Sequence, residues 1–66
     1  MDYAKLRGRI REKYGTEANF AREIGKTRAW LSAILNNKIN LKKSTMELFI
    51  EYLDIDSSEI NVYFFN

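Results

Sequence analysis

Apolar residues recur at helical spacing along most of the chain, and they predict a bundle of short helices. The first helix is expected from about Tyr3 to Tyr14, where Gly15 follows as a C-cap. The second is expected to begin after Thr16, a residue type that caps helix N-termini. The apolar residues that share the inward faces of these two helices are Tyr3, Leu6, Ile10, Tyr14, Phe20, Ala21 and Ile24.

The second half of the chain continues the pattern. A third helix is expected from Arg28 to about Asn36, and the sequence Ser44-Thr45-Met46-Glu47 is interpreted as a capping box that opens a fourth. The run from Ile60 to Phe65 suits either a short last helix or an extended strand, since its residues are β-branched or aromatic. The predicted fold is all-α, a compact bundle of four to five short helices in one domain over residues 1–66. The residues expected to face inward in the third and fourth helices are Leu31, Ile34, Leu35, Met46, Phe49, Ile50 and Leu53.

The junction between the second and third helices has the layout of a helix-turn-helix. Ala21 is small where the two helices must approach closely, and Gly25 can adopt the positive φ of a tight turn. Thr27 then caps the third helix. The dominant use of such a unit is to place its second helix in the major groove of DNA.

The charge is divided unevenly along the chain. Residues 1–43 hold all 11 basic residues and four acids, a formal charge of +7, whereas residues 44–66 hold five acids and no base, a charge of −5. A basic region around the helix-turn-helix suggests a polyanionic partner on one side of the molecule. Ordinary solvated charge on a small domain is the alternative explanation.

Several classes of function are disfavoured by composition. The chain has no cysteine and no histidine, so we expect no disulfide, metal site or cofactor, and no enzymatic activity or small-molecule substrate. No apolar run approaches the roughly 20 residues of a membrane span. The first residues, Met1 to Lys5, lack the apolar core of a signal peptide. We therefore expect a protein of the cytoplasm of a bacterial host.

The third helix is expected to read DNA from the face opposite Leu31, Ile34 and Leu35. Arg28 can donate two hydrogen bonds to guanine, and small residues let the backbone approach the bases. Lysines and asparagines past the helix suit the flanking phosphates. The residues expected to contact DNA on this basis are Lys26, Thr27, Arg28, Ala29, Trp30, Ser32, Ala33, Asn36, Asn37, Lys38, Lys42 and Lys43.

Some of these residues have a purely structural alternative. Thr27 can act only as a cap, and Trp30 can cover one shoulder of the core. Asn37 can end the third helix in a left-handed conformation. Lys42 and Lys43 can be solvated loop charges.

The segment from about Thr16 to Lys38 resembles the lambda-repressor-like helix-turn-helix family, through Ala21, Gly25, Leu31 and Ile34. The whole chain is similar to small Cro-like phage repressors, which consist of the DNA-binding domain alone. The resemblance implies a phosphate-binding glutamine at the start of the second helix. This chain has Glu17 there, which repels phosphate, and Asn19 is the expected substitute.

The resemblance also implies a second subunit, which meets the loop before the fourth helix and the segment after it. The function expected is therefore a sequence-specific transcriptional regulator, a phage or prophage repressor that occupies a two-fold operator in double-stranded DNA as a weak homodimer. The alternative is a protein-interaction module, antirepressor-like or antitoxin-like, which the acidic half and the terminal aromatic cluster favour. The expected dimer residues are Leu41, Ile55, Tyr63, Phe64 and Phe65.

Overall fold

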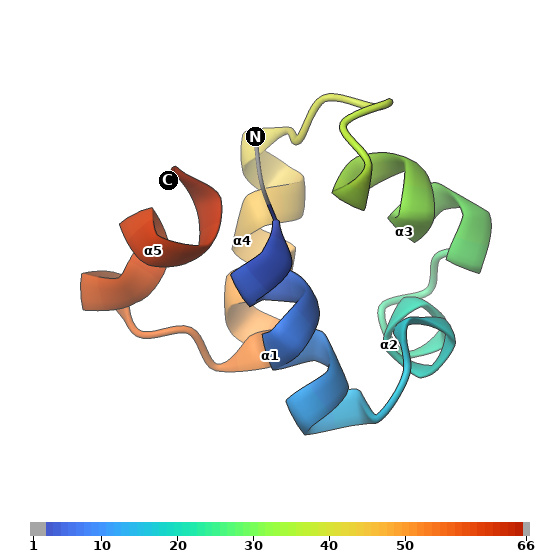
Figure 1. The fold of residues 1–66 in the computed structure, drawn as a ribbon, viewed down its shortest axis with the longest axis horizontal. Helices are drawn as coiled ribbons and strands as arrows, with labels where there is room; N and C mark the ends of the chain where they lie inside the picture. The colour runs from blue at the N-terminus through green and yellow to red at the C-terminus, as the bar shows by residue number, and fades with distance from the viewer. Residues whose placement is uncertain (1–2, 66) are drawn as a thin grey trace.

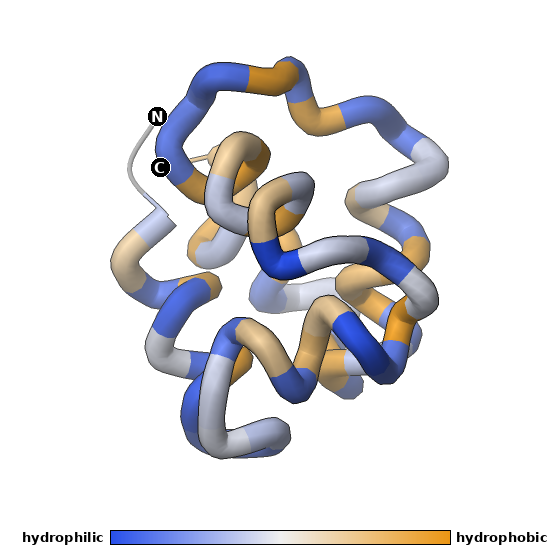
Figure 2. Tube along the Cα trace, turned by 90° about the vertical axis from the view of Figure 1, so that its right-hand side faces the viewer, coloured by the Kyte–Doolittle hydropathy of each residue, from blue (hydrophilic) through white to orange (hydrophobic). Residues whose placement is uncertain are grey.

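The computed structural model describes residues 3–65 and is all-helical over that range, as the sequence predicts. Helix α1 lies at the centre, packed against α2 and α4 and, on its other side, against α5 (Figure 1). Orange hydrophobic and blue hydrophilic residues alternate along the helices in Figure 2, as amphipathic helices require. The elements in chain order are α1 (Ala4–Tyr14), α2 (Glu17–Glu23), α3 (Arg28–Leu35), α4 (Lys43–Leu53), the 3-10 turn η1 (Ser57–Glu59) and α5 (Ile60–Phe64). No helix in the described range is long and apolar enough to cross a membrane.

The ends of the first three helices follow the local signals. Gly15 ends α1 at a φ of 83°, and Gly25 makes the turn between α2 and α3 at a φ of 76°. The Thr16 hydroxyl accepts a hydrogen bond from the Asn19 amide, and the Thr27 hydroxyl accepts one from the Trp30 amide. Each cap satisfies an amide that the helix itself leaves without a partner, so both helices begin where predicted.

The predicted capping box at Ser44 is wrong. The N-cap of α4 is Lys42, two residues before Ser44, and Lys42 makes no side-chain capping bond. The amide of Met46 bonds the carbonyl of Lys42 at 2.9 Å, so Ser44 lies inside the first turn. Leu41 and Met46, on either side of this start, both pack against the core and fix the first turn of α4 in this register.

The C-terminal segment is helical rather than extended. The carboxylate of Asp56 accepts a bond from the Ser58 amide and opens the turn η1, which leads directly into α5. Ile60 and Phe64, four residues apart, both pack on the core from one face of α5. The helix buries Phe64 and leaves Val62 and Phe65 exposed.

The core is formed by one apolar cluster to which every helix contributes. Phe20 of α2 is its aromatic centre, with its ring centroid 5.1 Å from that of Tyr14 and 5.3 Å from that of Phe49. Such tilted and edge-on arrangements stabilise aromatic pairs beyond simple burial. The cluster therefore holds α1, α2 and α4 together.

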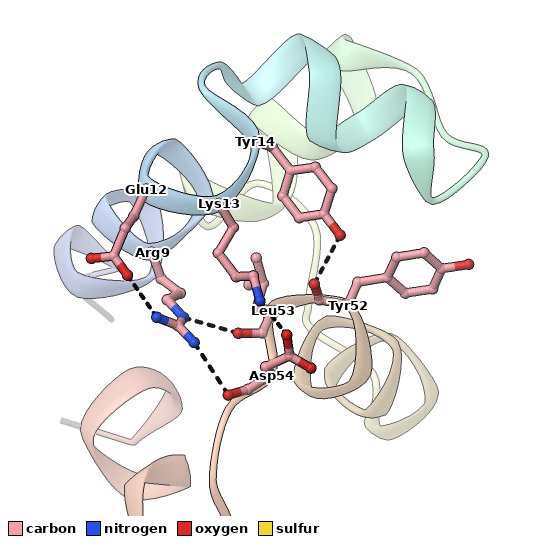
Figure 3. A network of polar contacts seen from close by, with 7 residues as sticks. All are labelled: Arg9, Glu12, Lys13, Tyr14, Tyr52, Leu53 and Asp54. Carbon is pink, nitrogen blue, oxygen red and sulfur yellow. Dashed lines mark hydrogen bonds and ion pairs between the residues drawn. The ribbon is translucent and has the colours of Figure 1, made fainter.

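Polar bonds fasten the end of α1 to the end of α4 (Figure 3). Arg9 donates to the carbonyls of Leu53 and Asp54, and the Tyr14 hydroxyl donates to the carbonyl of Tyr52 at 2.8 Å. The Lys13 ammonium pairs with the Asp54 carboxylate. These bonds satisfy carbonyls at the C-terminus of α4 that no helical amide can reach.

The two carboxylates near this junction are stabilised in their charged forms. A hydrogen bond from Lys13, together with the charges of Lys13 and Arg9, lowers the pKa of Asp54. Hydrogen bonds from the Ser58 hydroxyl and amide lower the pKa of Asp56. Both side chains are exposed, so these shifts reflect local bonds rather than burial.

Candidate functional site

Helices α2 and α3 pack on each other across the Gly25 turn in a helix-turn-helix arrangement. Leu31, Ile34 and Leu35 are buried, which confirms the predicted inner face of α3. Arg28 and Ala29 are exposed at the start of the helix, and Ser32 and Ala33 are half-buried. The side chains on the outward face of α3 after Arg28 are thus small and uncharged.

An arginine of α1 holds this face in place. The Arg7 guanidinium lies 3.1 Å from the Glu17 carboxylate of α2 and donates to the carbonyl of Leu35 at 3.2 Å. It also donates to the side-chain oxygen of Asn36 at 2.8 Å. Asn36 in turn donates to the Ser32 hydroxyl at 3.2 Å. Two of the expected DNA-contacting residues, Ser32 and Asn36, therefore bond to each other, and Asn36 also bonds to α1.

Arg7 and Arg11 were not among the site residues expected from the sequence, because no sequence pattern indicates that α1 borders the outward face of α3. With Arg28 they line a cleft of about 610 Å³. Glu17 also lines this cleft, so one carboxylate stands among three guanidinium groups. The arrangement can bind an anion, and Glu17 reduces the attraction by one charge. The remaining lining residues are Gly15, Thr16, Ala18 and Ser32.

Asn19 does not lie free for a phosphate contact. Its side-chain amide donates to the Tyr14 carbonyl at 3.0 Å, and its side-chain oxygen accepts from Arg22 at 3.1 Å. Asn19 thereby satisfies a carbonyl in the last turn of α1. Its polar atoms serve the α1–α2 junction.

The expected contacts beyond Arg28 form a second group around the loop after α3. The Lys26 ammonium lies 5.3 Å from the centre of the Trp30 ring, and Trp30 meets Phe49 edge-on at 6.2 Å. Trp30 is half-buried, so it covers the core and presents part of its ring. Asn37 has a φ of 60°, the left-handed conformation of a helix terminator. Lys38 and Lys42 are exposed in the same loop, and Lys43 is exposed at the start of α4.

Two of the expected dimer residues belong to the core. Ile55 is 7% exposed and Phe64 is fully buried, so neither side chain can meet a second subunit without rearrangement of the fold. The sequence hides this because both residues lie close to the C-terminus, where tertiary contacts decide burial. Leu41 and Tyr63 are half-buried, and Phe65 is 57% exposed.

Comparison with known proteins places the whole chain in a family. A family model described as "Protein of unknown function (DUF739)" matches residues 1–66. The chain belongs to this family. No match was found among curated proteins.

A solved structure is similar along nearly the full length. It is the solution structure of the modulator of repression (MOR) of the temperate bacteriophage TP901-1 from Lactococcus lactis, at 37% sequence identity and a TM-score of 0.86. The match covers 98% of this chain and 88% of that chain. The helical fold described above is therefore shared with a phage regulatory protein.

Proposed function

We propose that this protein is a phage regulator that modulates repression through contact with a protein partner, the phage repressor, rather than as an independent operator-binding repressor. The full-length similarity to a modulator of repression carries this proposal. It favours the protein-interaction alternative over the DNA-binding interpretation of the sequence.

The geometry of the helix-turn-helix supports the same choice. Glu17 occupies the start of α2, where a phosphate would approach, and its carboxylate is retained there by Arg7. Ser32 and Asn36 bond each other, so their polar groups are less available for base edges. A helix-turn-helix with these features is poorly suited to read DNA on its own.

The experiment compares the protein, the repressor and their mixture on operator DNA by fluorescence anisotropy. We expect the protein alone to show no sequence-specific retention of DNA. We expect the mixture to change the affinity of the repressor for its operator, with saturation at a fixed ratio of the two proteins. An operator affinity that stays the same in the mixture would contradict the proposal.

Direct DNA binding as a weak homodimer on a two-fold operator is the second candidate, and the exposed cations favour it. Arg28 stands at the start of α3, and Lys38, Lys42 and Lys43 follow the helix. If these residues neutralise phosphates, the logarithm of the binding constant falls with the logarithm of the salt concentration by about 0.9 per contact.

Selection from a random DNA pool tests this candidate. Enrichment of one sequence by the protein alone, lost in Arg28→Ala and kept in the control Lys5→Ala, would favour DNA binding over the protein partner. Lys5 is a suitable control because it is exposed on α1 and does not line the arginine cleft.

A further inference from the structure

A second surface, apart from the arginine cleft, is centred on Ile39 in the loop between α3 and α4. Ile39 is 42% exposed. It lies between two grooves and lines both of them, one of about 350 Å³ and one of about 250 Å³. Ile39 therefore presents an apolar side chain to solvent between two hollows of the surface.

The larger groove is lined by several apolar side chains, together with Asn37 and Asn40. Buried Tyr3 and Phe64 line it together with half-buried Leu41 and Met46, and Phe65 borders it with 57% of its surface exposed. Within residues 3–65, none of the residues that line it is charged. Such a groove can seat apolar side chains from outside against its hydrophobic wall, while its asparagines can bond a polar group.

The smaller groove combines an aromatic wall with positive charge. Trp30 and Ile34 provide the apolar lining, and Lys26 and Lys42 provide the cations. The Lys26 ammonium is held over the Trp30 ring at 5.3 Å. None of the described residues that line the two grooves is acidic, so Lys26 and Lys42 attract carboxylates next to apolar groups.

We propose that these two grooves bind one amphipathic segment of a protein partner, with apolar side chains seated on both sides of Ile39 and carboxylates paired with Lys26 and Lys42. This inference rests on the proposed function, since it specifies the chemistry of the partner. Exposed aromatic anchors beside a charged rim are the composition of protein–protein interfaces. A nucleic acid would engage the lysines and leave the apolar wall of the larger groove uncovered.

The test uses three short synthetic helical peptides that share one apolar face and carry glutamate, glutamine or lysine beside it. Each is titrated into the full protein and followed by backbone amide chemical shifts. We expect the glutamate peptide to bind about fivefold more tightly than the glutamine peptide, as for two exposed ion pairs, and the lysine peptide to bind most weakly. The shifts are expected at Ile39, Leu41 and Phe65.

Matched variants separate the two grooves from the rest of the surface. Ile39→Ser is expected to lower the affinity for the glutamate peptide at least as much as replacing the peptide's glutamates with glutamines does. Val62→Ser is expected to leave that affinity unchanged. Val62 is an appropriate control because it is 37% exposed on α5 and lines neither groove. Lys42→Glu is expected to remove the preference for the glutamate peptide over the lysine peptide, because one ammonium and one carboxylate then line the smaller groove. Lys5→Glu is expected to preserve that preference.

Three results would overturn the inference. The first is equal binding of all three peptides, the second is a set of shifts centred on the arginine cleft, and the third is an Ile39→Ser variant that binds like wild type. A concentration-dependent dimer in sedimentation that Ile39→Ser abolishes would assign the surface to a second copy of the chain instead.

The outcome is separable from that of the proposed function. The peptide titration contains neither repressor nor operator DNA, so peptide binding with no effect on repression would contradict only the proposed function. If the Ile39→Ser and Lys42→Glu variants both still change the operator affinity of the repressor, only the assignment of the partner to this surface would be contradicted.

Discussion

Arg7 of α1 and Glu17 of α2 form an ion pair at 3.1 Å, and both side chains are mostly shielded from solvent. The pair joins two helices at the edge of the arginine cleft. It also places a carboxylate where the resembled DNA-binding family has a phosphate-binding glutamine. One contact therefore affects both stability and the choice of partner.

Replacing Glu17 with glutamine is expected to separate these two effects. Loss of the pair, and of a favourable charge in the first turn of α2, should lower the free energy of unfolding by about 1 kcal/mol. Nonspecific DNA affinity at low salt should rise, because the cleft loses its carboxylate. Chemical denaturation and anisotropy measure the two quantities.

Glu12→Gln is the matched control for this variant. Glu12 pairs with Arg9 within α1, but its side chain is 68% exposed, so its loss should change the free energy of unfolding by no more than about 0.5 kcal/mol. If Glu17→Gln behaves like Glu12→Gln in both measurements, the Arg7–Glu17 pair has no special role.

Gly25 and Gly8 are expected to respond oppositely to alanine. Neither added Cβ atom would meet another atom within 4 Å, so backbone conformation alone decides the outcome. Gly25→Ala should lower the free energy of unfolding by about 1–2 kcal/mol, because alanine is strained at a φ of 76°. Gly8→Ala, inside α1, should raise the free energy of unfolding by about 0.5–1 kcal/mol, because alanine reduces the entropy of the unfolded chain. Thermal melts of both variants test the conformation of the turn. Equal shifts of the melting temperature in the same direction would contradict a positive φ at Gly25.

The two adjacent phenylalanines near the C-terminus are expected to differ sharply. Phe64 is fully buried and Phe65 is 57% exposed. Phe64→Ala should lower the free energy of unfolding by about 3–5 kcal/mol, enough to unfold much of a small domain. Phe65→Ala should change it by about 0.5 kcal/mol or less. Urea titration distinguishes them, and similar midpoints would show that α5 does not close the core.

The Lys13–Asp54 pair predicts a pH dependence of stability. The pKa of Asp54 is lower in the folded protein, so the unfolded chain binds the proton more readily. The contribution of the pair is fully present above the ordinary carboxyl pKa of 3.8 and is lost as the pH falls through the lowered folded value.

Asp54→Asn isolates this contribution, because asparagine tolerates the left-handed conformation that Asp54 adopts at a φ of 51°. The difference in unfolding free energy between wild type and variant should be constant near neutral pH and should shrink below the ordinary pKa. A difference that grows on acidification would contradict the pairing.

The sequence by itself determined the helical fold and most helix ends. Thr16 and Thr27 accept bonds from amides three residues ahead, and Gly15 and Gly25 adopt positive φ, because these effects act within one turn of the chain. The helical spacing of Leu31, Ile34 and Leu35 likewise identified the buried face of α3, since periodicity is a local property.

Only the tertiary structure decided which side chains remain available at the surface. Ile55 and Phe64 are buried by distant parts of the chain, and Arg7 reaches Asn36 across 29 positions in sequence. The start of α4 at Lys43 similarly follows core packing of Leu41 and Met46 rather than the capping motif. Burial and long-range bonds depend on distances between helices, and no periodicity or local propensity contains those distances.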